Sequence, residues 1–388
     1  MLIQRSYKTE LRPTLKQIEQ FKRHAGVARL AFNWALGERI KHYEATGKNI
    51  SWLEQDRIFN ALKKTDFRFC FESSKWAHQN GIKDCDAAFQ GFFRNIKKGM
   101  KTGFPKFKSK HRSRKKFRFG CGVIVFKHSI TFPVIGNVLL KRRGYVPVYG
   151  VKINSVTVSE RAGRWFVSVQ VEQEIAVTEN QSGTIVGLDL GLKTAVVASD
   201  GTSHDAPKFL RKSLKKLKRM QRAFNRKKNG GANRERAKAR IARLYYKISC
   251  QRSDWQHKIS HQYTRDFAIV VMEDLNVSGI MKNHNLAFSI SDVGWNEIRR
   301  QIAYKTIWRG GKLIVADRFF PSSKMCHICK CVNKDLKLKQ REWSCLNCGS
   351  HLDRDENASK NLEEYGTARL CRNQSNCDEK SVESHRAH

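Results

Sequence analysis

The spacing of apolar residues divides the N-terminal part of the chain into a strand and a set of helices. Residues 2–11 have the texture of a short strand. Thr14 with Gln17 three residues later is the pattern of a capping box, and Gly47 is a typical helix stop. Helical spacing, with aromatic residues between basic ones, then continues well beyond this glycine. We therefore expect a short strand followed by a helical lobe over residues 13–103.

The period changes from helical to two after this lobe. In residues 155–171, valines stand two apart on both sides of the dipeptide Ala162-Gly163, which is the pattern of a β-hairpin. Glycine, proline and β-branched residues accompany the change. These features predict a small β domain over residues 104–182.

The second half of the chain alternates short apolar runs with helical stretches, which predicts an α/β domain. Ile185 to Ala198 holds two apolar runs around a glycine and predicts a buried hairpin. The continuous apolar run from Phe267 to Met272 predicts a strand buried on both faces, and Lys312 to Ala316 predicts another strand. Asp292 is placed to cap the helix between them. The polar segment from Tyr365 to His388 lacks periodicity, so we expect it to be disordered.

A strongly basic helical pair interrupts this pattern. Residues 208–247 hold 17 basic residues and one acidic residue, Glu235, yet keep apolar residues at helical spacing. Residues 229–231, Asn-Gly-Gly, separate two helices, and we place the pair at residues 208–250. The charge could form a solvated face or a surface that binds a nucleic-acid backbone, and the ratio of basic to acidic residues gives the second interpretation at least equal weight.

The whole chain carries the same excess of positive charge. Its 388 residues include 75 Lys and Arg against 35 Asp and Glu, a net charge of +40. Such a field attracts polyanions, so DNA or RNA is the leading partner. A ribosome-associated protein and a binder of anionic membrane surfaces are the alternatives, although no apolar run approaches the roughly 18 residues that cross a bilayer. Because its start has no signal-peptide core, we expect the protein in the cytoplasm, without a membrane.

Two carboxylates stand where strands should be most buried. Asp189 follows the apolar residues 185–188, and Glu273 ends the run over residues 267–272. An unpaired buried carboxylate is costly, and either a divalent cation or a salt bridge to a nearby Lys or Arg would remove the cost. A second such position, and a third near Asp355, favour the cation. The set can bind two Mg²⁺ ions, with Mn²⁺ as the alternative metal, to activate water and stabilise the leaving oxygen of a phosphodiester.

The third carboxylate has two candidates, Asp353 and Asp355. Asp353 with Glu356 three residues later fits a capping box for the helix that follows. This leaves Asp355, in the first helical turn, to face a metal, so Asp355 is the predicted ligand. Asp274, which competes with Glu273 in the same way, is better suited to a turn.

Four cysteines form the most specific local pattern. Cys326 and Cys329, then fifteen residues, then Cys345 and Cys348 match the spacing of a four-cysteine zinc site. Eleven cysteines, an odd number in a chain without secretory features, argue against a disulfide framework. The predicted zinc is structural, because four protein ligands leave no open position for catalysis. Three nearby residues could replace one cysteine: His327, Cys331 and His351.

Seven segments together carry a likeness to a known family. They are Phe32–Leu36, Phe104–Lys110, Gly187–Lys193, Glu273–Gly279, Ile290–Trp295, Phe320–Cys329 and Asp353–Ala358. They resemble the TnpB (OrfB) family of insertion sequences, and the likeness covers nearly everything before the polar tail. One departure is Lys330, where members often have a glycine after the second cysteine.

The resemblance implies an α/β multidomain architecture. Its parts would be a ribonuclease-H-like (RuvC) nuclease domain, an inserted zinc ribbon, and a β-barrel wedge domain that carries the helical lobe as a recognition lobe. The resemblance also implies that Asp189, Glu273 and Asp355 are catalytic and that the four cysteines bind zinc. The implied ranges are 1–12 and 104–182 for the wedge, 13–103 for the recognition lobe, 183–320 and 351–364 for the nuclease, 321–350 for the ribbon, and 365–388 for the disordered tail.

Members of this family are RNA-guided DNA endonucleases, related to the compact type V CRISPR effectors. A guide RNA from the transposon end pairs with target double-stranded DNA beside a short adjacent motif, and the RuvC-like site cuts both strands. The resemblance thus implies a magnesium-dependent endonuclease of the prokaryotic nucleoid. The alternatives are a non-cleaving RNA-guided repressor and a transposase or recombinase accessory protein. Retention of all three carboxylates argues against a protein that only binds.

Overall fold

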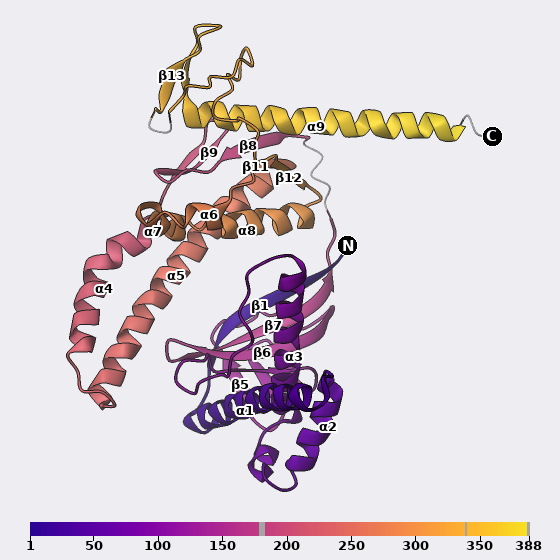
Figure 1. The fold of residues 1–388 in the computed structure, drawn as a ribbon, viewed down its shortest axis with the longest axis vertical. Coiled ribbons are helices and arrows are strands. Elements are labelled where there is room, and N and C mark those ends of the chain that lie inside the picture. Colours follow the sequence, from indigo (N-terminus) through magenta and orange to yellow (C-terminus); the bar gives the residue numbers. More distant parts are fainter. Residues whose placement is uncertain (178–182, 338–339, 386–388) are drawn as a thin grey trace. The chain divides into compact units, whose positions relative to one another are not determined.

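The chain forms two compact units, Met1–Ile175 and Ala176–His388. The computed structural model describes residues 1–177, 183–337 and 340–385, without the side chains of residues 284–285 and 373–385. Each unit has its own sheet (Figure 1). Each also has its own hydrophobic core. Within these described ranges, no helix is long and apolar enough to span a bilayer.

The sheet of the first unit has seven antiparallel strands in the order β2-β6-β7-β1-β5-β4-β3. The predicted hairpin is confirmed, because Ala162 and Gly163, with φ of 56° and 77°, join β6 to β7 in a two-residue turn. The predicted first strand is also confirmed and pairs with β7. The strands are β1 Leu2–Arg12, β2 Lys116–Phe119, β3 Ile124–Val125, β4 Ser129–Phe132, β5 Gly136–Leu140, β6 Val151–Arg161 and β7 Arg164–Glu174.

Helices of the first unit pack on this sheet and on one another. The predicted capping box is confirmed: the Thr14 hydroxyl accepts the N–H of Gln17 (3.3 Å), and the Gln17 side chain accepts the N–H of Thr14 (3.0 Å). Gly47 ends the helix with φ of 67°. Phe21 packs into the core under the sheet, whereas Phe59 belongs to a second core between the helices. These helices are α1 Leu15–Thr46, α2 Trp52–Leu62 and α3 Lys75–Lys97, with a 3₁₀ turn at Arg68–Glu72.

A buried histidine is expected to make the first unit sensitive to acid. His78 stacks on Phe59 with 5.3 Å between ring centroids, and burial, aided by Lys63, lowers its pKa from 6.5 to about 4. Above pH 6.5 both folded and unfolded chains hold this side chain neutral. As the pH falls from 6.5 to about 4, only the unfolded chain binds the proton, so the free energy of unfolding should drop by about 3 kcal/mol.

Denaturant unfolding at a series of pH values measures this loss. His78→Phe keeps an aromatic ring on Phe59 and should lose most of the dependence of the unfolding free energy on pH. His111→Gln, at an exposed position, should keep this pH dependence. Some pH dependence of the unfolding free energy should remain in both variants, because burial also lowers the pKa of His24. A pH dependence in His78→Phe equal to that of the unaltered protein would contradict the prediction.

The sheet of the second unit has five strands in the order β10-β9-β8-β11-β12. The strand β8 pairs antiparallel with β9 and parallel with β11, which in turn pairs parallel with β12. The predicted hairpin and both later strands are therefore confirmed. Because β8, β11 and β12 are parallel, their carboxyl ends meet at one edge of the sheet. The strands are β8 Ile185–Asp189, β9 Thr194–Ala198, β10 Ser203–Asp205, β11 Ile269–Glu273 and β12 Lys312–Ala316.

One long helix, α9 (Arg354–His385), packs across this sheet and contacts β8 more than any other strand (Figure 1). The prediction of a disordered tail from Tyr365 is wrong for the described residues, because the helix continues to His385. Tyr365 and Leu370 pack beside β11 and β12, and no glycine or proline follows Gly366 to break the helix. Tertiary contacts thus extend a helix that its polar composition concealed.

Close approach of α9 to the sheet requires a glycine. A Cβ atom on Gly187 would lie 2.0 Å from the carbonyl oxygen of Ser359 and 2.6 Å from the backbone nitrogen of Glu363. Gly187→Ala should therefore lower the unfolding free energy of the second unit by at least about 1–3 kcal/mol. The matched control is Gly91→Ala in α3, where a Cβ meets nothing within 4 Å and should stabilise by up to ~1 kcal/mol. Equal stability of both variants in denaturant titrations would exclude this packing role.

The basic pair forms two helices, α4 (Phe209–Asn225) and α5 (Ala232–Asp266), as predicted. The second helix is longer than the predicted end at residue 250, because Ile259 and Tyr263 at its far end are buried in the core of the sheet. Gly230, with φ of 78°, lies in the turn between the helices. The exposed basic part of the pair is thus continuous with a helix anchored in the second unit.

Asp292 does not cap the helix that follows it, contrary to the prediction. Its buried carboxylate accepts the backbone N–H of Leu210 (3.1 Å) and an N–H of Arg252 (3.0 Å). Gly294, with φ of 71°, begins the next helix instead. Asp292 therefore fixes the start of α4 beside α5, since a helix N-terminus favours a negative charge. The remaining helices are α6 Val277–Ile280, α7 His284–Val293 and α8 Trp295–Trp308.

Candidate active site and metal centre

Two of the predicted carboxylates end neighbouring parallel strands. Asp189 is the last residue of β8, Glu273 is the last residue of β11, and the register pairs Leu188 with Met272 directly before them. The acids are therefore adjacent at the carboxyl edge of the sheet. Both side chains are only half-buried, so solvent and ligands can reach them.

Asp189, Glu273 and Asp355 form an acidic group in which the charges of the other two residues act on Asp189. Its pKa is raised well above the usual range, first by burial and then by the negative charges of Glu273 and Asp355. Arg354 and the backbone N–H of Leu190 oppose this shift without cancelling it. The fold therefore brings the three predicted acids within range of mutual repulsion, from two strands and one helix.

The two acids at the start of α9 have different partners. The Asp353 carboxylate accepts the backbone N–H groups of Asp355 and Glu356 (2.9 Å each), so Asp353 caps the helix as predicted. Asp355, in the first turn, accepts N–H groups from one nitrogen of Arg341 on both of its oxygens (2.8 Å each). The capping role thus belongs to Asp353, whereas Asp355 pairs with Arg341 and lies near enough to Asp189 to raise its pKa.

Asp274 and Glu273 also differ in their partners. Asp274 pairs with Arg299 (2.8 Å) and Arg318 (2.6 Å), whose hydrogen bonds lower its pKa. Glu273 instead accepts a short hydrogen bond from the hydroxyl of Ser322. The carboxylate of Asp274 is paired with two guanidinium groups. Glu273 is therefore the acid of this pair that acts on Asp189.

Ser322 connects the acidic group to the cysteine segment. Its hydroxyl bonds Glu273, and its carbonyl oxygen accepts the side-chain amides of Asn357 (3.4 Å) and Asn361 (2.8 Å). Both asparagines are buried residues of α9, the helix that also carries Asp355. One serine therefore links the end of β11 to the start of α9.

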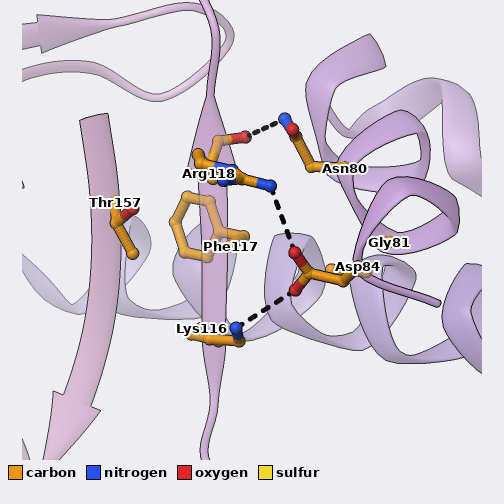
Figure 2. A pocket seen from close by; sticks show the side chains of 8 residues that line it. Asn80, Gly81, Asp84, Lys116, Phe117, Arg118 and Thr157 are labelled. Carbon is orange, nitrogen blue, oxygen red and sulfur yellow. Dashed lines mark hydrogen bonds and ion pairs between the residues drawn. The ribbon is translucent and has the colours of Figure 1, made fainter. Parts of the chain in front are cut away.

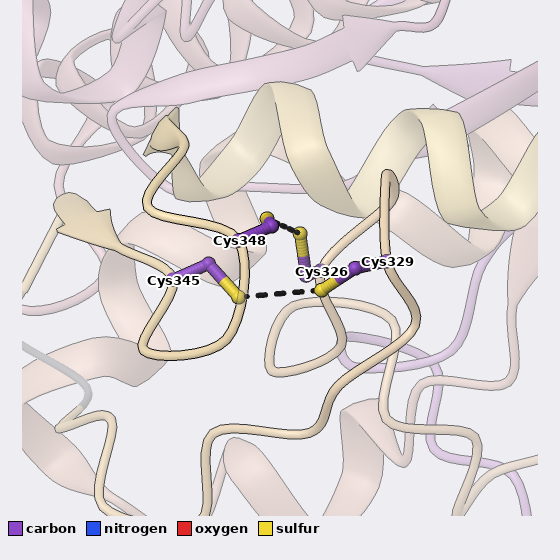
Figure 3. A group of neighbouring side chains, drawn as sticks. All are labelled: Cys326, Cys329, Cys345 and Cys348. Atoms are coloured by element: carbon purple, nitrogen blue, oxygen red, sulfur yellow. Dashed lines mark hydrogen bonds between the residues drawn. The ribbon is translucent and has the colours of Figure 1, made fainter.

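The four predicted cysteine ligands converge (Figure 3). Their Sγ atoms all lie within 4.8 Å of one another, with 3.7 Å between Cys326 and Cys348 and 3.4 Å between Cys329 and Cys345. Tetrahedral zinc with Zn–S bonds of about 2.3 Å needs S···S separations of about 3.8 Å. The Asn347 side chain helps to lower the pKa of Cys329 to about 6, which favours the thiolate that a metal needs. The cluster can bind a structural metal.

Two matching turns hold these cysteines. The N–H of Lys330 donates to the carbonyl of Cys326 (3.0 Å), and the N–H of Gly349 donates to the carbonyl of Cys345 (2.9 Å). Lys330 and Gly349 are both left-handed, with φ of 63° and 69°. Lys330 thus keeps the backbone conformation of the glycine it replaces, at a cost of about 1–2 kcal/mol. The three alternative ligands lie outside the cluster: His327, Cys331 and His351.

A two-stranded ribbon joins the cysteines to the acids. It consists of β13 (Glu342–Ser344) and β14 (His351–Asp353), which pair antiparallel. Arg341 directly precedes β13, and Asp353 ends β14 at the start of α9. The fold of this ribbon therefore determines whether Arg341 reaches Asp355.

Sequence reasoning missed the residues that connect the two sites. Their side-chain partners are far away in the sequence, and serine, asparagine and arginine carry no spacing signal of their own. The Asn357 and Asn361 pair, four residues apart on one helix face, was the one available hint. The missed residues are Ser322, Arg341, Asn357 and Asn361.

Three family models match the chain. A model described as a probable transposase covers residues 166–284, a Cas12f1-like TNB domain covers 295–362, and a helix-turn-helix domain covers 1–48, which here fold as β1 and α1. The chain also has the fold of a solved Cas12f1, determined in a complex with sgRNA and target DNA. The TM-score is 0.57 at 16% identity, over 90% of this chain and 82% of that chain. The chain therefore has an α/β fold similar to that of a compact Cas12f effector.

Relatives extend this likeness over almost the full sequence. A Streptomyces pristinaespiralis protein, provisionally named an RNA-guided DNA endonuclease, is 34% identical over 94% of this chain and 90% of its own length. InsQ of Escherichia coli K12, with the same provisional name, is 32% identical over 94% of this chain and 93% of its own length. The chain belongs to the TnpB (OrfB) family of insertion-sequence proteins.

Proposed function

We propose that this protein is an RNA-guided DNA endonuclease whose nuclease domain is RuvC-like. The observation that carries the proposal is that Asp189 and Glu273 end neighbouring parallel strands of the five-stranded sheet, and that Asp355 is near enough to help raise the pKa of Asp189. Strand order supports it as well, because three antiparallel strands followed by two parallel ones form a ribonuclease-H-type sheet. The names of its relatives agree.

The three acids would hold Mg²⁺, or Mn²⁺ in its place. The raised pKa of Asp189 supports this fit, because burial first, and then the negative charges of Glu273 and Asp355, disfavour its ionised form, and a divalent cation would stabilise that form. The bound ions would supply water activation and stabilisation of the leaving oxygen during phosphodiester hydrolysis. Ser322 orients Glu273, Asp353 orients the turn that carries Asp355, and Arg341 balances the charge of Asp355. The cysteines would hold one structural Zn²⁺ that fixes the ribbon.

Ser322→Ala tests the orienting hydrogen bond. Loss of an outer partner of a metal ligand costs roughly 10–100-fold in metal affinity or activity, so the Mg²⁺ concentration that half-saturates cleavage should rise by that factor. Ser322→Thr keeps the hydroxyl and should restore most of the affinity. The Mg²⁺-induced thermal shift provides a second readout, and an unchanged Mg²⁺ requirement in Ser322→Ala would count against the role.

The nucleic-acid partners follow from the charge. A guide RNA from the transposon end and target double-stranded DNA would bind the basic surface of a chain with a net charge of +40, including the α4–α5 pair. Base pairing, rather than protein contacts, would supply most of the sequence specificity. The protein would act on DNA in the cytoplasm.

The decisive experiment has two steps. RNA that copurifies with the protein is sequenced, and a plasmid library randomised beside a matching target is then incubated with the complex and Mg²⁺. We expect cleavage beside one short motif. Tight RNA-dependent DNA binding without cleavage would instead favour a repressor, and joined DNA products would favour a recombinase.

A further inference from the structure

The first unit contains a cavity of about 160 Å³ that lies outside every site described above. It lies between α1, the segment before β2, and β2 itself, and a smaller cavity of about 70 Å³ adjoins it at Asp84 and Lys116. Ala25 and Ala28 form its apolar wall, since their small side chains leave room beside α1. Its polar lining residues are Arg29, Asp84, Lys108, Ser113, Arg114, Lys115 and Lys116.

The lining carries a net positive charge. Five cations face one carboxylate, Asp84, whose oxygens are already engaged by Lys116 (3.1 Å) and Arg118 (3.1 Å), as Figure 2 shows from the adjoining cavity. Lys115 is likewise engaged, by Glu160 (2.7 Å). The unbalanced charge therefore belongs mainly to the cations contributed by α1 and by the segment before β2, namely Arg29, Lys108 and Arg114.

Lys108 is held in place before any ligand binds. Its backbone N–H donates to the Asn33 side chain (2.7 Å), and its carbonyl accepts the amide of the same asparagine (3.0 Å). Its Nζ lies 3.2 Å from the ring centroid of Phe32. Burial lowers the pKa of Lys108 to about 8. The fold thus tolerates a partly desolvated cation in an already positive cavity, which is an arrangement typical of an anion site.

We propose that this cavity is the seat of one backbone phosphate of the bound nucleic acid, with Arg29, Lys108 and Arg114 as its cations. Two segments distant in sequence supply these side chains, α1 for Arg29 and the segment before β2 for Lys108 and Arg114, whereas a solvated basic face would come from one helix. A phosphodiester carries the charge and the acceptor oxygens that such a set binds. The inference rests on the proposed function only in taking a nucleic acid as the ligand.

Binding assays on the full chain test the proposal. The background variant Asp189→Ala, without Mg²⁺, prevents cleavage, and the probes are a short single-stranded RNA and a DNA duplex of the same sequence. Arg29→Gln combined with Arg114→Gln should weaken binding of at least one probe by roughly tenfold or more near physiological salt. The slope of log affinity against log salt should fall by about 0.7 per lost contact for RNA or about 0.9 for duplex DNA.

The matched control is Lys41→Gln combined with Lys152→Gln, which removes the same charge from side chains that are each 77% exposed. A loss confined to RNA assigns the phosphate to RNA, and a loss confined to the duplex assigns it to DNA. Equal weakening by the cavity and control variants overturns the proposal, as does no weakening by either. Lys108→Met, which keeps the apolar stem, is a second probe, and thermal melts verify folding. Since no cleavage is measured, failure here is distinct from failure of the nuclease proposal.

Discussion

Asp189→Ala should reduce DNA cleavage by a thousandfold or more while RNA and DNA binding stay intact. Metal ions supply several kcal/mol of transition-state stabilisation, and about 4 kcal/mol corresponds to roughly a thousandfold in rate. Asp189 is the acid on which the charges of both Glu273 and Asp355 act, so its removal should take away the shared ligand. Plasmid cleavage with the copurified RNA measures the loss, and filter binding measures the retained affinity.

A second readout of the same variant does not depend on activity. Without metal, partial burial and the charges of Glu273 and Asp355 disfavour the ionised form of Asp189, so Asp189→Ala should melt at a higher temperature than the unaltered protein at neutral pH. Mg²⁺ should raise the melting temperature of the unaltered protein and leave that of the variant unchanged. Asp274→Ala is the matched control, because its carboxylate pairs with two arginines, and it should retain cleavage and the Mg²⁺ response. Undiminished cleavage by Asp189→Ala would refute the assignment of the site.

Loss of the structural metal should be the second large effect. Zinc binding to small structural sites contributes about 10–16 kcal/mol of apparent free energy, most of which is folding free energy. With the proposed zinc at this cluster, Cys326→Ala should therefore remove the bound metal, unfold the ribbon over residues 321–350, and abolish cleavage. Activity should fail because the same segment supplies Ser322 to Glu273 and Arg341 to Asp355.

Elemental analysis and thermal melts measure this effect. Cys331→Ala is the control, because Cys331 is exposed and lies outside the cluster, and it should keep zinc and activity. A chelator such as phenanthroline should reproduce the behaviour of Cys326→Ala in the unaltered protein. A Cys326→Ala protein that retains full zinc content would show that another residue is a ligand.

Much of the architecture could be predicted because its signals are local. The Thr14 capping box, the Ala162-Gly163 turn and the apolar runs that became β8, β11 and β12 depend on residues next to one another in the sequence. The same holds for the cap at Asp353, three residues before its partner. Spacing also fixes each cysteine pair, since one short turn holds Cys326 with Cys329 and another holds Cys345 with Cys348.

Other features were decided by contacts between distant residues. Asp292 lost its expected role to the start of α4, 82 residues away, because a buried carboxylate must find donors wherever the fold offers them. The tail from Tyr365 became helix because it packs on a sheet, although its composition alone could not supply the free energy.

The sequence by itself determined which residues can do chemistry, because residue type and spacing fix the ligands and the local turns that present them. Only the tertiary structure decided how these residues are connected. Asp189 and Glu273 become neighbours through parallel pairing, and Ser322 and Arg341 join the acids to the segment that carries the four cysteines. The cavity at Lys108 likewise exists only after three segments meet. Long-range packing sets these contacts, and packing depends on the whole chain rather than on any one segment.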